Sequence, residues 1–261
     1  MLRTPSVLAP FIIFAAIQIL VLVCLSVFHV PPLASLMVPV VKLLGGEQAL
    51  HFPMHLILLP RMYHLVYLPL AVFVGFGLFG WAVSLMVEHH ERAGVKIERR
   101  QRRSVKTLLP SLIVLGIVYV VCVTGLQLLS SSLAGIVAHP KAASVVSLAG
   151  VAVVVVVQAL IVYSVYFLVV RTANPFEAVS ESVSFGRRHL GITSLIVFTV
   201  FVIHLPIDYL AQRANQVVLK FDPQLVFVLL AAGIVVEIVT SYFLFAATTS
   251  VATGGRPEEL G

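Results

Sequence analysis

Charged residues are scarce in this sequence, and their scarcity excludes a water-soluble fold. Only 11% of the 261 residues are Asp, Glu, Lys or Arg, against roughly 25% in soluble domains, and 60% are hydrophobic. Apolar runs of about 20 residues recur along the chain, which is the length that an α-helix needs to cross a bilayer. These runs are too long and too uniformly apolar for the alternating strands of a barrel. We therefore expect an all-α polytopic membrane protein.

Sequence signals for soluble catalysis are also missing. The chain contains no Gly-rich phosphate loop, no nucleophile elbow and no HExxH zinc-protease motif. Its two cysteines, Cys24 and Cys122, lie in apolar runs, where a thiol behaves as a small hydrophobic group. The formal charge of +6 lies between the apolar runs, where it orients a membrane protein and meets anionic lipid. We expect no enzymatic activity, no cofactor, no bound metal and no nucleic-acid partner.

Six apolar segments are predicted to be membrane spans within one domain of residues 1–261. Their approximate limits are 7–30, 63–87, 108–132, 145–170, 192–212 and 223–249. If both termini are cytoplasmic, only five of the 17 Lys and Arg residues fall on the outer side: Lys42, Arg61, Lys141, Arg213 and Lys220. Because basic loops tend to stay on the cytoplasmic side, this asymmetry predicts cytoplasmic N and C termini.

The first cytoplasmic loop, residues 88–107, is strongly basic. At its start, Glu88 and Arg92 are four residues apart in the order that stabilises a helix, so the second span is expected to continue to Gly94. Four arginines further along are expected to contact anionic lipid headgroups: Arg99, Arg100, Arg102 and Arg103. A cytoplasmic protein is the alternative partner for this loop.

The second cytoplasmic loop, residues 172–191, contains a helix start signal. Asn174, Pro175 and Glu177 occupy the positions of an N-cap, an N1 proline and an N3 capping-box acid. Such a cap satisfies backbone N–H groups that have no partner inside the first helical turn. A helix is therefore expected to begin at Pro175.

This helix is predicted to be amphipathic and to lie at the membrane interface. Phe176, Val179 and Val183 recur at helical spacing and form an apolar face opposite Glu and Ser residues. The helix is expected to end near Gly186. The two basic residues that follow are expected to contact lipid headgroups at the inner surface: Arg187 and Arg188.

Residues 31–61 are apolar, but proline and glycine interrupt them too often for a straight span. Gly45 and Gly46 predict a turn between two short arms. A re-entrant hairpin would carry Lys42 and Glu47 into hydrocarbon, which is costly for charged groups. Interfacial helices on the outer face are therefore preferred, with the re-entrant hairpin as the alternative.

Glu237 is the most informative polar residue of the predicted spans. It lies near the middle of the sixth span, in AAGIVVEIVTSYF, without a basic residue nearby in that span. Intramembrane acids either mark ion or proton pathways, or stay protonated and donate a hydrogen bond to another helix. A rise of 1.5 Å per residue places Gln158 of the fourth span at a similar depth, so the two side chains are candidates to meet.

The fifth span carries a second polar group, formed by His204 and Asp208 on either side of Pro206. Pro206 frees a backbone carbonyl one turn earlier and is expected to kink the helix. By the same depth count, both side chains lie nearer the outer surface than Glu237. A proton relay joining Glu237, His204 and Asp208 needs bridging water, Ser, Thr or Tyr. A polar kink at the outer interface is the simpler interpretation of His204 and Asp208.

Histidines raise two weaker alternatives, a metal site and a haem site. A metal site needs three or four converging ligands, and Glu47, His51 and His55 lie in a segment that proline interrupts. A haem requires two histidines on facing helices at one depth. The candidates for that role all lie in the outer half of the spans, where histidines are usually interfacial: His29, His64 and His204.

The C-terminal third of the chain resembles bacterial six-helix membrane families. The order NPFEAVSESVSFGRRHLG, an apolar span, and a last span closing in YFLFAATTSVATGG is similar to that of the membrane domain attached to some glycerophosphodiester phosphodiesterases. Those families place a Pro-x-x-Ala, Ser and basic series before the fifth span, matched here by Pro175, Ala178, Ser182, Arg187 and Arg188. The apolar insertion at residues 31–61 departs from that pattern. The resemblance implies a six-helix architecture and a bacterial cytoplasmic membrane.

Two functions are compatible with these features. The first is a non-catalytic membrane subunit that scaffolds or assembles with other membrane proteins or with copies of itself. It is favoured by the scarcity of intramembrane polar residues and by the apolar segment 31–61, which can dock a partner. The alternative is a transporter or channel for a small molecule, ion or lipid, favoured by Glu237 and by the interrupted fifth span.

Overall fold

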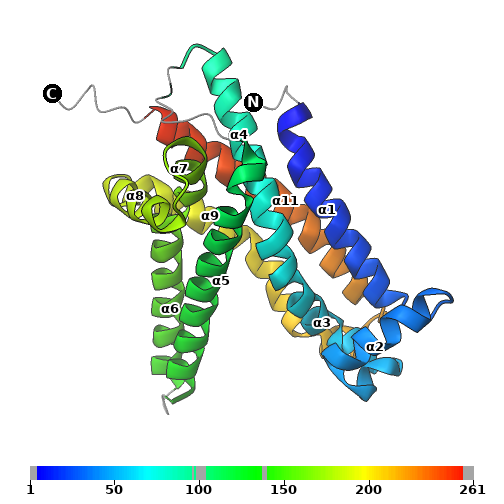
Figure 1. Ribbon diagram of the computed structural model, residues 1–261. Helices are drawn as coiled ribbons and strands as arrows, with labels where there is room; N and C mark the ends of the chain where they lie inside the picture. The colour runs from blue at the N-terminus through cyan, green and yellow to red at the C-terminus, as the bar shows by residue number, and fades with distance from the viewer. Residues whose placement is uncertain (1–4, 96, 98–103, 137–139, 255–261) are drawn as a thin grey trace. The chain divides into compact units, whose positions relative to one another are not determined.

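The computed structural model describes residues 5–95, 97, 104–136 and 140–254, and it is helical (Figure 1). Within these residues, six helical segments are long and apolar enough to cross a membrane: Ser6–Ser26, Met54–Arg92, Val105–Leu133, Ser144–Val170, Leu190–Gln212 and Leu225–Gly254. The prediction of an all-α multi-pass membrane protein is confirmed at this level. Large apolar side chains are exposed along these helices, as contact with lipid requires. The cytoplasmic placement of the termini stays a prediction.

Two compact units make up the chain, and each combines stretches that are distant in sequence. Unit 1 contains Met1–Pro10, Val72–Phe201 and Tyr242–Gly261. Unit 2 contains Phe11–Ala71 and Val202–Ser241. Four of the six long helical segments contribute residues to both units, so each unit is described here by itself.

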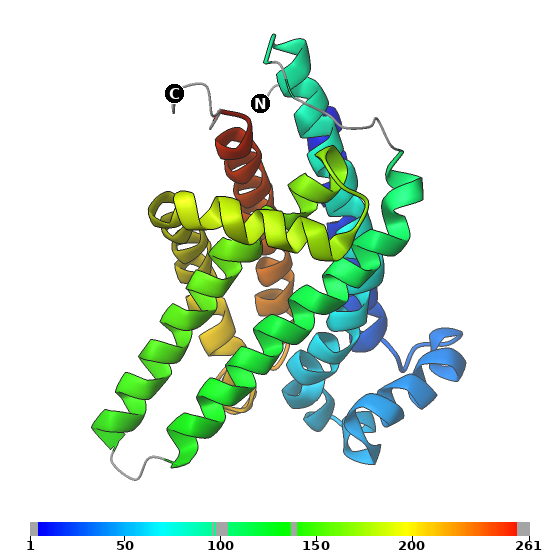
Figure 2. The same cartoon turned by 60° about the vertical axis from the view of Figure 1, so that its left-hand side comes forward.

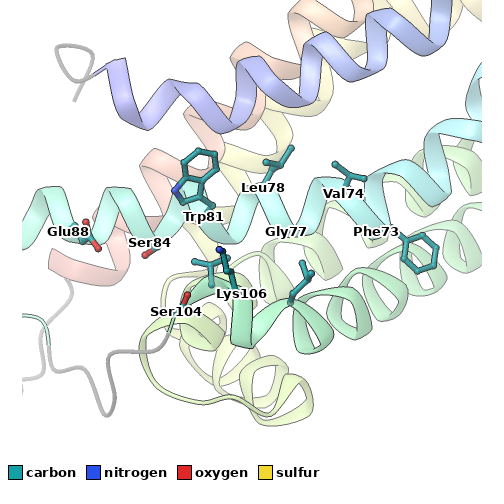
Figure 3. A pocket seen from close by; sticks show the side chains of 11 residues that line it. Phe73, Val74, Gly77, Leu78, Trp81, Ser84, Glu88, Ser104 and Lys106 are labelled. Atoms are coloured by element: carbon teal, nitrogen blue, oxygen red, sulfur yellow. The ribbon is translucent and has the colours of Figure 1, made fainter. Parts of the chain in front are cut away.

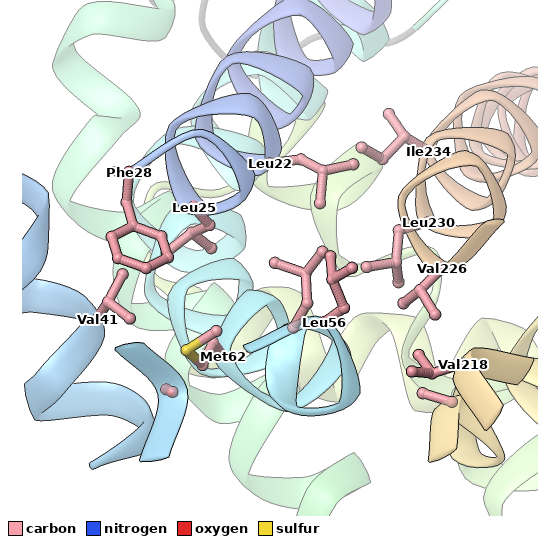
Figure 4. Packing of buried hydrophobic residues seen from close by; sticks show 13 residues of the cluster. Leu22, Leu25, Phe28, Val41, Leu56, Met62, Val218, Val226, Leu230 and Ile234 are labelled. Carbon is pink, nitrogen blue, oxygen red and sulfur yellow. The ribbon is translucent and has the colours of Figure 1, made fainter. Parts of the chain in front are cut away.

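Unit 2 is built mainly from four helical segments around an apolar core. These are most of α1 (Pro5–Ser26), all of α3 (Met54–Leu70), the second half of α9 (Leu190–Gln212) and the first half of α11 (Leu225–Gly254). Figure 4 shows side chains from α1, α3 and α11 meeting, with Leu22, Leu25 and Leu230 among them. Since lipid is as apolar as leucine, this core stabilises the unit through close packing more than through exclusion of water. The short helix α10 (Ala214–Lys220) adds Ala214 and Val218.

Residues 31–61 form a helix, a turn and the beginning of the second long helix. Helix α2 (Leu33–Gly45) packs Val41 into the unit 2 core and leaves Leu43 exposed. The predicted turn is confirmed, because Gly46 has φ +74 and a Cβ on Gly45 would lie 2.6 Å from that of Ala49. The 3₁₀ turn η1 (Glu47–Leu50) follows.

The predicted start of the second span at residue 63 is wrong. The helix begins at Met54 and runs to Arg92, through a π-helical turn η2 (Ala71–Gly75) that leads into α4 (Phe76–Arg92). Pro60 lies inside this helix, although proline predicted a break. A helix of this length accommodates it because apolar contacts of Leu59 and Met62 on either side hold the segment in the core. The predicted end is confirmed, since Gly94 closes the helix with φ +89.

Unit 1 contains a pair of long helices, α5 (Val105–Ile136) and α6 (Pro140–Ile161), which lie side by side and antiparallel (Figures 1 and 2). Their close approach depends on small residues. A Cβ on Gly150 of α6 would lie 2.4 Å from the Cβ of Ser130 on α5. Small residues bring helix backbones together in this way in many membrane proteins.

The predicted fourth span, 145–170, is not one uninterrupted helix. Helix α6 ends at Ile161, and a turn at Val162 and Tyr163 separates it from α7 (Ser164–Val170). Tyr163 is fully buried, and its hydroxyl lies 2.7 Å from Oγ1 of Thr193 on α9. Hydropathy does not show this turn, because Tyr163 and Ser164 are only two residues in an otherwise apolar run.

Helix α8 (Pro175–Arg188) begins at the predicted cap. The Asn174 side chain accepts a hydrogen bond from the amide of Phe176 at 3.0 Å. The amide of Asn174 donates to the hydroxyl of Thr172, which in turn donates to Glu177 at 2.6 Å. Glu177, the acid at N3, is therefore linked to the amide of the N-cap residue Asn174 through Thr172. In a simple capping box the N3 side chain accepts directly from that amide.

Helix α8 packs against the protein through small residues, a face that the sequence analysis did not single out. Ala178, Ser182 and Gly186 are buried, whereas Phe176 is 67% exposed. Helix α8 lies across α6, where the Ser182 hydroxyl donates to the carbonyl of Leu160 at 2.7 Å (Figure 2). The small residues face inward because only they allow the helix to approach the backbone of α6 this closely.

Six arginines are predicted to contact lipid headgroups, and the structure describes two of them. Arg187 and Arg188 are exposed at the end of α8, which is compatible with the prediction. The remaining four arginines lie outside the described residues: Arg99, Arg100, Arg102 and Arg103. Glu88 and Arg92 form the expected i, i+4 pair, at 3.9 Å.

Candidate functional site

Glu237 lies at the centre of a polar cluster inside unit 2. Its Oε1 accepts a hydrogen bond of 2.6 Å from the hydroxyl of Tyr67, so α11 is joined to α3. Tyr67 in turn stacks with Tyr63 and His64 of its own helix, at ring-centroid distances of 6.1 and 6.5 Å. A carboxylate can accept about four hydrogen bonds, so the bond from Tyr67 leaves acceptor capacity on Glu237.

Helix α1 contributes a second hydrogen bond to this cluster. Gln18 is fully buried, and its Oε1 accepts a bond of 2.5 Å from the hydroxyl of Tyr63. The amide nitrogen of Gln18 lies within interaction range of Glu237, but in the described part of the chain it makes no hydrogen bond of normal geometry. A buried donor without a hydrogen bond is costly, and the carboxylate of Glu237 is the acceptor within reach of this amide.

Helix α9 reaches the cluster through His204. Its Nε2 lies 2.8 Å from Oγ1 of Thr240, one turn of α11 beyond Glu237. The Thr240 hydroxyl itself donates to the carbonyl of Val236 at 2.8 Å. Both bonds are satisfied together when Nε2 of His204 carries the proton, which leaves Nδ1 as the acceptor of a neutral ring.

Asp208 extends the cluster along α9. It interacts electrostatically with His204 on its own helix and with His64 on α3. Its charge also acts on Glu237, more weakly than the hydrogen bond from Tyr67 does. Pro206 lies between His204 and Asp208 inside a helix that continues to Gln212, and its predicted kink stays a prediction.

The structure assembles most of the predicted polar site and adds groups that the sequence reading missed. Glu237, His204 and Asp208 all lie in unit 2, whereas Gln158 lies in unit 1, so a pairing of Gln158 with Glu237 stays a prediction. The missed residues are the neutral partners Gln18, Tyr63, Tyr67 and Thr240. A signal for them existed, because Tyr63, His64 and Tyr67 lie on one helical face and Gln18 interrupts a long apolar run.

The cluster is not built as a metal site. Among the described residues, no three His, Cys, Asp or Glu side chains are placed to bind one metal ion. The sequence analysis considered Glu47, His51 and His55 as metal ligands. In the structure Glu47 pairs with Lys42 at 2.6 Å, and His55 packs against the ring of Phe28. The cluster instead combines hydrogen-bonding groups and groups that can take up or release a proton.

Comparison with known proteins adds no assignment, since no family model, no curated protein and no solved structure matches the chain.

Proposed function

We propose that the chain is a membrane transporter or channel in which the polar cluster of unit 2 carries protons or another small cation. The observation that supports this most is Glu237, an acid inside a candidate span that receives a hydrogen bond from Tyr67 and retains acceptor capacity. Ionisable groups are costly in hydrocarbon, and where they occur inside spans they commonly mark ion and proton pathways.

The contacts of the cluster suggest an order of groups for such a pathway. Asp208 and the two histidines near it would exchange protons or attract a cation at one end. Thr240 connects His204 to the turn of α11 that carries Glu237. Beyond Glu237, Tyr67, Tyr63 and Gln18 provide hydroxyl and amide groups that can be rearranged around a passing ion.

Flux into proteoliposomes tests this proposal. Purified protein is reconstituted with an internal pH-sensitive dye, a potassium diffusion potential is applied, and proton entry is measured; sodium and potassium uptake are measured in parallel. Glu237→Gln should remove most of the flux. Glu47→Gln, which alters an exposed acid of the same unit, should leave it unchanged. Equal flux in wild type, Glu237→Gln and empty vesicles for all three cations would overturn the proposal.

A non-catalytic subunit is the second candidate, and the exposed side of α8 supports it. Phe176 is 67% exposed beside the helix cap, and the helix ends in two exposed arginines. An aromatic side chain at the tip of a packed helix can anchor a protein partner. Phe176→Ser should then release a stoichiometric partner that is retained by wild type in mild detergent. A wild-type chain that purifies alone and monomeric would overturn this candidate.

Both candidates are proposed for a bacterial cytoplasmic membrane, with both termini in the cytoplasm and residues 31–61 on the outer face. The support is the asymmetry of Lys and Arg and the resemblance of the C-terminal third to bacterial six-helix membrane families. In this orientation Arg187 and Arg188 face anionic headgroups of the inner leaflet.

A further inference from the structure

A groove of about 700 Å³ in unit 1 runs along α4 and the beginning of α5. The polar cluster belongs to the other unit. The lining of the groove changes from polar to apolar along its length. Figure 3 shows Glu88 and Ser84 toward one end, Ser104 and Lys106 nearer the middle, and Val74 and Phe73 toward the other end. Its volume lies within the range of about 300–1,000 Å³ that is usual for small-molecule sites.

The polar part carries groups of both charges. Lys106 is exposed in the first turn of α5, next to Ser104, which immediately precedes the helix. The first amides of a helix present a partial positive charge, so Lys106 and this helix end both favour an anionic group such as a phosphate. Glu88 provides a negative charge further along the groove, beyond Ser84. Its pair with Arg92 is 3.9 Å long and Arg92 is 81% exposed, so the Glu88 carboxylate keeps acceptor capacity.

The rest of the groove suits an acyl chain. Val74, Leu78 and Leu109 line it. Gly77 lets α4 approach α5 here, because an added Cβ would lie only 3.0 Å from Leu109. Trp81 lies between Glu88 and Val74, at the level of Lys106, and is 37% exposed (Figure 3). Tryptophan favours the level of the membrane where headgroups meet chains.

We propose that this groove binds a bilayer phospholipid with a phosphoethanolamine headgroup. Lys106 and the first amides of α5 contact the phosphate, Glu88 contacts the ammonium group, and one acyl chain lies along Val74, Leu78 and Leu109. The acid at the polar end selects against lipids with a net negative charge, because it repels a second anionic group. A trimethylated ammonium is also disfavoured, because it has no N–H to donate to Glu88.

Native mass spectrometry of the purified full-length chain tests this assignment. The protein is delipidated in mild detergent and titrated separately with phosphatidylethanolamine, phosphatidylglycerol and phosphatidylcholine of identical chains. Wild type should retain phosphatidylethanolamine best. Lys106→Gln should weaken that binding roughly tenfold, since a charge-assisted hydrogen bond is lost. Lys220→Gln removes the same charge from unit 2 and should have no effect.

Two further variants separate the headgroup from the groove itself. Glu88→Gln should abolish the preference for phosphatidylethanolamine over phosphatidylglycerol, whereas Ser84→Phe should reduce binding of all three lipids by filling the groove. Lys106 is exposed, so the test stands on Lys106→Gln even if Ser84→Phe fails to fold. Equal retention of the three lipids by wild type, or unchanged binding in Lys106→Gln, would overturn the proposal.

Discussion

The hydroxyl of Tyr67 on α3 donates a hydrogen bond of 2.6 Å to Oε1 of Glu237 on α11, across 170 residues of sequence. This bond joins the second and the last of the long helical segments inside unit 2. It gives an acid within a candidate span a specific neutral partner. The bond is an interhelical contact whose strength can be measured.

Removing the Tyr67 hydroxyl should destabilise the protein. Interhelical hydrogen bonds in membrane proteins average about 0.6 kcal/mol and reach about 1.7 kcal/mol. A double-mutant cycle with Tyr67→Phe and Glu237→Leu, measured by reversible unfolding in mixed micelles, should give a coupling free energy in that range. Tyr209→Phe is the control, because Tyr209 is exposed and its ring lies under Arg213. A coupling of zero would mean that the bond does not form in the folded protein.

Enlarging Gly186 should detach α8 from α6. A Cβ at this position would lie 3.1 Å from the Cα of Leu160 and 3.2 Å from the carbonyl oxygen of Ala159. Backbone atoms cannot rotate away, so Gly186→Leu should cost roughly 1–3 kcal/mol, as overpacking usually does. Thermal unfolding in detergent measures this.

The matched control for that change is Gly191→Leu. Gly191 is also helical, but a Cβ there meets no heavy atom within 4 Å in the described structure. Its substitution should leave the unfolding temperature close to that of wild type. A similar drop in unfolding temperature in both variants would show that the effect comes from replacing a helical glycine and not from the contact of α8 with α6.

Removing the cap of α8 should loosen its first turn. Asn174→Ala deletes the acceptor for the amide of Phe176, and such substitutions cost about 1 kcal/mol. Hydrogen–deuterium exchange should increase at the first amides of α8. Ser180→Ala, at an exposed position within the same helix, should not increase it. Unchanged exchange in Asn174→Ala would contradict the capping role.

Labelling of single cysteines should reveal the orientation of the chain. In a background of Cys24→Ala and Cys122→Ala, Phe52→Cys should react with a membrane-impermeant maleimide on intact cells, because Phe52 is exposed in the segment predicted to lie outside. Phe176→Cys should react only after lysis. The reverse pattern would place the termini outside and invert the proposed topology.

Local chemistry determined much of this architecture. The long apolar helices could be located from hydropathy, because a helix that crosses lipid must be apolar over its whole length. The start of α8 at Pro175 was predictable, since the Asn174 cap and the following proline act on neighbouring amides. The turn at Gly45 and Gly46 was predictable because glycine readily adopts a positive φ, as Gly46 does.

Tertiary structure decided which polar groups meet and which faces pack. The bond from Tyr67 to Glu237 could not be read from depth counting, because a meeting of two side chains depends on helix rotation and neighbourhood as well as on depth. The inward face of α8 is its small-residue face, since the nearby backbone of α6 admits only Ala, Ser and Gly there. Hydropathy indicates that a segment lies in lipid. Lipid and protein interior are similarly apolar, so hydropathy does not indicate which side of the segment touches another helix.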